Sequence, residues 1–156
     1  MSFGTVAFAG KLTTVDTTPS YPLGYTVVVP AKGDGLGNQV WIYVKSEDVI
    51  VQGSVVSRKA GESTYIGILA PIDSTISRVI GVAQHAIASG SYGFILREGV
   101  GEVLADAGGV TADLGLMLGD AAGTADAASA VTTDSFGVAT ETVASGLATC
   151  RICCRG

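Results

Sequence analysis

A phrase that occurs twice in the chain constrains its fold more than any other feature. The first copy spans residues 80–90 and the second spans 136–146, and both contain Gly-Val-Ala and Ala-Ser-Gly at an offset of 56 residues. Each copy begins with an apolar residue, and an apolar stretch follows its last glycine. Glycine readily adopts the left-handed conformation that tight turns require. We therefore predict two related hairpins, each made of a strand, a polar corner, a turn and a second strand.

The composition also favours strands over helices. Hydrophobic residues make up 47% of the 156 residues and charged residues only 15%, and there are 22 glycines. Abundant β-branched residues and frequent glycines are typical of β-rich proteins with many turns. No long stretch shows the 3.6-residue period of an amphipathic helix. We expect one all-β domain, a small Gly-rich antiparallel β-barrel or sandwich.

The best-defined strands lie in the first third of the chain. Residues 25–29 and 40–45 are mostly β-branched or aromatic, and a loop at residues 31–38 with the spacing Gly-x-Gly-x-Gly separates them. We expect a hairpin with an extended loop. Further expected strands lie at 49–57 with a bend at Gly53, 65–69, 79–84, 92–97, 100–105, 116–118 and 148–154, with a tight turn at Glu98-Gly99 and a loop at 119–130.

The N-terminal region lacks a clear strand pattern. We expect residues 1–22 to form an arm that either packs on its own domain or reaches over a neighbour. Residues 23–156 are expected to form a single β domain, with a mild sub-division near 71–77. Residues 3–22 and the loop at 31–38 show no internal packing signal, so they are our candidates for contacts with other proteins.

Charge and hydropathy exclude two classes of partner. The formal net charge is −5, and no basic residue occurs between Arg97 and Arg151. Phosphate contacts need clustered Lys and Arg, so we expect no nucleic-acid partner. No stretch approaches the roughly 20 apolar residues of a membrane-spanning helix, and no signal peptide follows Met1. We expect a protein made in a cytoplasm, with no membrane partner.

Two groups of residues are candidates for a ligand site. A phosphate cradle needs a helix after its glycine loop, whereas a strand follows the loop at 31–38, which favours a flexible hairpin loop. A zinc site needs four Cys or His ligands, and Cys150, Cys153 and Cys154 stand alone near one end of the chain. Adjacent strand residues also point to opposite faces. We expect these cysteines to be small packed residues, with an interchain bridge as the alternative.

His85 is the single histidine and sits at the corner of the first repeat, where the second copy has Glu141. This exchange of polar residues predicts a solvent-facing corner. No nucleophile or orienting carboxylate motif accompanies the histidine, so we expect no enzyme, no catalytic residue, and neither a metal nor a cofactor. The large aromatic side chains are expected in the core or at a subunit interface: Tyr21, Tyr25, Trp41, Tyr43, Tyr65 and Tyr92.

Several of these motifs resemble those of small virion proteins of tailed bacteriophages, of the head decoration or cement type. The resemblance rests on Leu23-Gly24 before a strand, the glycine-rich loop, the 41–45 strand and the Gly-Val-Ala…Ala-Ser-Gly-x-Tyr-Gly phrase, and it covers about residues 23–152. In such proteins a Gly-Glu-Val strand, at 101–103 here, separates two hairpins. The resemblance implies a compact barrel-like domain without catalysis that forms trimers or dimers. It also implies the major capsid protein as partner and a place on the capsid surface of a virion assembled in the host cytoplasm.

Two alternatives remain open at this level. The chain could be another virion component, such as a fibre base, neck or vertex protein. It could also be a barrel-sandwich carrier domain, which residues 101–103 and 116–119 suggest. Carriers of that type present a lysine at an exposed hairpin tip, and no lysine follows Lys59.

Overall fold

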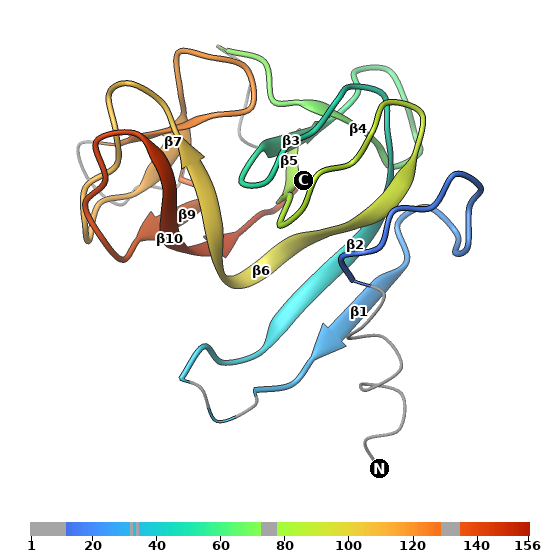
Figure 1. The fold of residues 1–156 in the computed structure, drawn as a ribbon, viewed down its shortest axis with the longest axis horizontal. Helices are drawn as coiled ribbons and strands as arrows, with labels where there is room; N and C mark the ends of the chain where they lie inside the picture. The colour runs from blue at the N-terminus through green and yellow to red at the C-terminus, as the bar shows by residue number, and fades with distance from the viewer. Residues whose placement is uncertain (1–11, 32, 34, 73–77, 129–134) are drawn as a thin grey trace.

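The structure is a computed structural model that describes residues 12–31, 33, 35–72, 78–128 and 135–156 (Figure 1). The described residues form strands and no helix, which confirms the predicted all-β class. The strands are β1 Thr26–Val29, β2 Gln39–Ser46, β3 Val55–Arg58, β4 Ile66–Leu69, β5 Val79–Val82, β6 Tyr92–Ala105, β7 Leu116–Leu118, β8 Ala125–Ala127, β9 Gly137–Ala139 and β10 Gly146–Cys153. Most pairs are antiparallel, and β2–β4 and β6–β8 are parallel.

Five strands close into a barrel in the order β2-β4-β3-β5-β6, because β6 pairs back with β2. Side chains alternate along β2, so Ile42 and Val44 belong to the barrel interior and Trp41 and Tyr43 to a second cluster outside it. The interior cluster consists of Ile42, Val44, Ile50, Val56, Ile80, Ala83, Ile87 and Ile95. Closure leaves these five strands without free edges.

Strand β6 corrects one of our predictions. The expected tight turn at Glu98-Gly99 is wrong, because the chain continues through it as one 14-residue strand. Gly99 has a φ of 120°, and the register between β2 and β6 shifts between Val40 and Trp41. The shift leaves Arg97 of β6 as the extra residue of a β-bulge, and Gly99 two positions later lets the strand bend without reversing. The N-terminal half of β6 therefore closes the barrel, and its C-terminal half pairs with β10.

The strands after β6 repeat the order of the first barrel. Around the C-terminal half of β6 they follow the sequence β6-β8-β7-β9-β10, and β10 pairs back with β6. The link between β7 and β9 is a bridge between Gly115 and Val138. The isolated bridge Ile50–Ile87 in the first unit has its counterpart in Val110–Val143 of the second. Strand β6 is thus shared by two units of the same connectivity.

Backbone hydrogen bonds at the corners show how closely the two units correspond. In the first unit Gly53 N donates to Ala83 O at 2.7 Å, and in the second Asp113 N donates to Ala139 O at 2.9 Å. Gly53 and Asp113 both have positive φ, 82° and 66°. The two related hairpins that the repeat predicts are therefore parts of a larger duplicated unit that includes β3, β4, β7 and β8.

The N-terminal region packs on its own domain where the structure describes it. Leu12 is 5% exposed, and the backbones of Asp16 and Tyr92 exchange two hydrogen bonds of 2.8 and 2.9 Å. Tyr21 packs against Tyr43 and Phe94. Of the two alternatives for the arm, packing on its own domain therefore holds for residues 12–22, although the sequence carried no signal for it. Parts of three predicted features lie outside the described residues: 3–11 of the arm, 73–77 of the expected sub-division and 129–130 of the expected loop at 119–130.

Tyr43 ties the N-terminal segment to the barrel. Its hydroxyl donates to Asp16 Oδ2 at 2.7 Å and accepts from Ser20 N at 3.1 Å. Burial, and then the Asp16 carboxylate, raise the pKa of Tyr43 to about 12, so the hydroxyl keeps the proton it donates.

We expect Tyr43→Phe to lower the free energy of unfolding by about 1–2 kcal/mol, because the substitution removes one hydrogen bond to a charged group and one from a backbone amide. Urea unfolding measures the loss, and hydrogen exchange at the Asp16 amide should become faster. Tyr65→Phe is the control, since the Tyr65 hydroxyl makes no hydrogen bond with the described residues. An unchanged Asp16 exchange rate in Tyr43→Phe would show that the hydroxyl does not hold the segment.

The other aromatic residues divide between core and surface. Trp41 is 6% exposed and belongs to the larger buried cluster, against which Tyr21 and Tyr92 pack. Tyr65 packs on the barrel interior, whereas Tyr25 is exposed and stacks on Tyr21. In the described part of the chain no helix is long and apolar enough to cross a membrane.

Candidate interaction surface

His85 does not lie at a solvent-facing corner, so that prediction is wrong. Both ring nitrogens are buried, and neither has a hydrogen-bond partner among the described residues. A Cβ on Gly93 would lie 3.3 Å from His85 Nε2, so the ring packs against the start of β6. Burial lowers the pKa of His85. Glu141, its counterpart in the repeat, is exposed and accepts a hydrogen bond from Thr149 N at 2.6 Å, which lowers its pKa.

We expect the free energy of unfolding to fall as the pH drops below about 6.5, the pKa of an unfolded histidine. The folded protein binds this proton less readily than the unfolded chain, so acid favours unfolding. The slope should stay below the roughly 1.4 kcal/mol per pH unit of a fully buried group, because His85 is partly exposed. Urea unfolding between pH 7.5 and pH 5.5 (~2 pH units around that pKa) measures it. His85→Gln should flatten the profile, and an identical slope in this variant would contradict the assignment.

The three cysteines differ in burial. Cys150 and Cys154 are buried in the larger core cluster, while Cys153 is exposed on the same strand end. Burial raises the pKa of Cys150 to about 12 and also raises that of Cys154. Metal ligation and nucleophilic attack require the thiolate, so these two thiols act as small apolar side chains. The described residues contain no group of three or more His, Cys, Asp or Glu side chains placed to hold a metal ion.

The glycine-rich loop connects β1 to β2 as a hairpin loop, as predicted. Figure 1 shows the β1–β2 hairpin extending away from the barrel. Asn38 Oδ1 accepts a hydrogen bond from Ala31 N at 2.9 Å and closes the base of the loop. Gly33, Gly35 and Gly37 have φ values of 82°, 80° and 72°, and a Cβ on any of them would meet no atom within 4 Å. The glycines are needed here for their conformation, and the loop surface is open.

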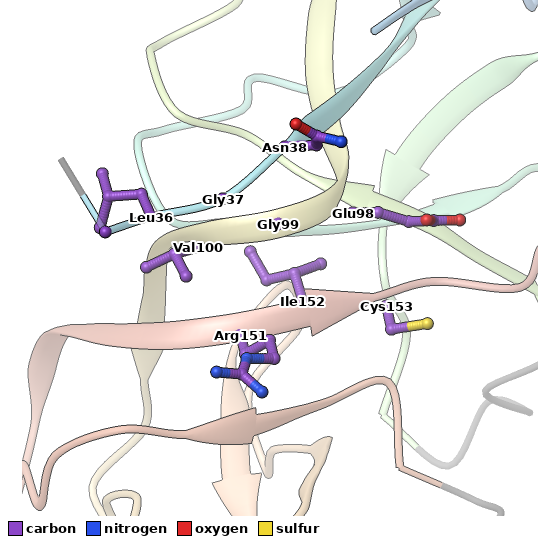
Figure 2. A pocket seen from close by; sticks show the side chains of 10 residues that line it. Leu36, Gly37, Asn38, Glu98, Gly99, Val100, Arg151, Ile152 and Cys153 are labelled. Carbon is purple, nitrogen blue, oxygen red and sulfur yellow. The ribbon is translucent and has the colours of Figure 1, made fainter. Parts of the chain in front are cut away.

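A groove of about 360 Å³ separates this loop from the two long strands (Figure 2). Residues 35–38 line one side, and residues 98–100 of β6 and 151–153 of β10 line the other. The groove therefore combines the Leu36 and Val100 side chains with one guanidinium, Arg151, and one carboxylate, Glu98. This mixture of apolar and charged groups suits contact with a protein surface.

The strand side of this groove has no sequence signal. Residues 98–100 and 151–153 lie more than 50 positions apart in the chain, and they become neighbours through the pairing of Gly99 with Ile152. Gln39 links this region to the hairpin, since its Nε2 donates to Val100 O at 2.9 Å. The loop at 31–38 was predicted as a contact site from sequence, whereas Glu98, Val100 and Arg151 were missed.

Fold and surface together define a class: a closed five-stranded β-barrel with additional strands outside it and a projecting hairpin. No protein-family model matches the sequence, and no curated protein matches it either. Among solved structures, the fold is similar to the head fiber gp8.5 N base of bacteriophage phi29, with a TM-score of 0.54 and 17% sequence identity. The match covers 73% of this chain and 93% of that one.

Proposed function

We propose that this chain is a non-enzymatic structural protein of a tailed-bacteriophage virion and that it serves as an attachment module on the head surface. The observation that carries the proposal is the fold similarity, which spans nearly the whole base domain of a phage head fiber. The sequence motifs at residues 23–152 independently resemble small phage virion proteins. Both observations support a structural protein of the phage head, and the fold similarity favours a base-type module that binds the head.

The decoration or cement role is the second candidate, and the sequence resemblance favours it. A cement protein that binds only the mature shell stabilises that shell by mass action. A fibre base binds the same surface but has no need to stabilise it. The carrier alternative receives no support from the fold comparison.

Copy number and head stability together test the proposal. Quantitative mass spectrometry of purified particles should find the chain in the head, and heating of heads with and without it separates the two roles. Hundreds of copies together with a higher melting temperature indicate a cement, roughly a dozen or fewer indicate a tail or vertex part, and intermediate numbers without stabilisation indicate a fibre base. Absence of the chain from particles would end the proposal.

The hairpin loop is our candidate for the head contact. We expect Leu36→Asp to weaken binding to purified heads about tenfold or more, because it places a charge on an apolar contact. Met117→Asp is a matched control: Leu36 is 44% exposed and Met117 is 43% exposed, but Met117 lies on β7. Co-sedimentation with heads measures both variants. Equal binding by the two variants would remove the loop from the interface.

A further inference from the structure

Strand β1 is exceptional in the topology of this fold. The strands of the barrel and of its repeat each pair with at least two others, counting the bridge between β7 and β9. In the described part of the chain, β1 alone pairs with a single strand, β2, and so keeps one free edge. A free edge presents unpaired N–H and C=O groups that invite another strand.

The pairing with β2 identifies which backbone groups are free. Tyr43 N donates to Tyr25 O at 2.8 Å, so Tyr25 directs its backbone carbonyl toward β2. Successive residues of an antiparallel strand direct their backbone N–H and C=O groups to opposite sides. The backbone groups of Val27 therefore face β2, as the Tyr25 carbonyl does, whereas the N–H and C=O of Thr26 and Val28 face away from it. Thr26 is exposed and Val28 is 58% exposed, so both residues are accessible to a partner.

The edge lacks the features by which proteins usually block strand addition. No charged residue occurs between Asp16 and Lys32, and the register of β1 with β2 is regular from Thr26 to Val29. Natural edge strands are commonly protected by lysines, bulges or inward charges. Pro30 follows the strand and limits its length without blocking Thr26 or Val28. Two further exposed apolar residues, Tyr25 and Leu36, lie on the same hairpin.

We propose that β1 is a self-association edge, at which β1 of a second copy of this chain pairs antiparallel about a two-fold axis near Val27. In that register Thr26 of the first copy exchanges two backbone hydrogen bonds with Val28 of the second copy. Val28 of the first copy does the same with Thr26 of the second. The outward groups of the strand are thus complementary to themselves. Pairing extends the sheet continuously from β6 through β2 and β1 into the second copy.

The outward groups of β1 match those of a second copy, and charge does not oppose such a copy at this edge. Two chains of net charge −5 repel each other over most of their surfaces. Between residues 17 and 31 no charge is present, so approach at β1 brings no like charges into direct contact. The inference stands independently of the proposed virion role.

Sedimentation equilibrium of the purified chain over a wide concentration range tests the proposal. We expect a monomer–dimer equilibrium in which Val28→Lys and Val28→Pro each raise the dissociation constant about tenfold or more. Lysine places like charges across the edge, and proline removes an N–H that faces away from β2. Val28→Thr should keep the dimer, as should Val49→Lys, which changes a residue that is 67% exposed elsewhere.

Hydrogen exchange provides a readout that depends on the register. The amides of Thr26 and Val28 should become protected as concentration rises, whereas the Val27 amide, bonded to β2, should be protected at all concentrations. A monomer at every concentration would overturn the proposal and leave the edge for a different protein. A dimer that survives both Val28→Lys and Val28→Pro would also overturn it, as would one that Val49→Lys dissociates.

Discussion

Gly53→Ala should lower the free energy of unfolding by about 2–5 kcal/mol, a large part of the total stability of a domain of this size. Gly53 has a φ of 82°, and a Cβ there would lie 2.7 Å from Leu104 N and 2.5 Å from Leu147 Cδ2. Left-handed backbone costs an alanine about 1–2 kcal/mol, and the clash adds to this. Since Leu104 N donates to Gly53 O at 2.8 Å, the corner of the first unit cannot move away without breaking that bond.

Two variants separate the backbone term from the clash. Gly90→Ala has nearly the same φ, 80°, but its Cβ would meet no atom within 4 Å, so it should cost only about 1–2 kcal/mol. Gly53→Asn tolerates the left-handed conformation but keeps the clash, so it should recover part of the backbone cost and still be less stable than Gly90→Ala. Urea unfolding followed by circular dichroism gives all three values. Equal losses in Gly53→Ala and Gly90→Ala would show that the close approach to β6 has no energetic consequence.

Phe136→Ala is expected to lower the free energy of unfolding by about 3–5 kcal/mol, because Phe136 is fully buried and its removal leaves a cavity. Phe136 lies in the second unit, yet it belongs to the same buried cluster as Trp41 of β2. Strand β6 is also common to both units. The two halves should therefore unfold in one transition, and a cavity in one should destabilise the other.

The single tryptophan makes this cooperativity measurable. In Phe136→Ala, the urea midpoint from Trp41 fluorescence should move as far as the midpoint from far-ultraviolet circular dichroism. Met117→Ala, at an exposed position of β7, is the control and should move neither midpoint appreciably. A Trp41 transition that stays in place while the circular dichroism midpoint shifts would show that the second unit unfolds separately.

Sequence patterns recovered those features that depend on local chemistry. The β-branched and aromatic run at 40–45 predicted β2, and the loop at 31–38 predicted the hairpin with β1, because strand propensity and turn residues act over short distances. The prediction of a turn at Glu98-Gly99 was wrong because it, too, used only local chemistry. A glycine with positive φ serves equally in a turn and in a bent strand, and pairing with β2 and β10 selects the continuous strand.

The sequence by itself determined that the chain is all-β and carries an internal repeat, since periodicity, glycine spacing and the two Gly-Val-Ala phrases are properties of the sequence alone. Only the tertiary structure decided that the repeat is a unit sharing β6, that both ring nitrogens of His85 are buried, and that Arg151 and Glu98 line a groove opposite Leu36. These facts depend on which distant strands pair. Which strands pair is decided by the total apolar surface that the two core clusters bury. That total depends on residues far apart in the sequence, so no local pattern predicts it.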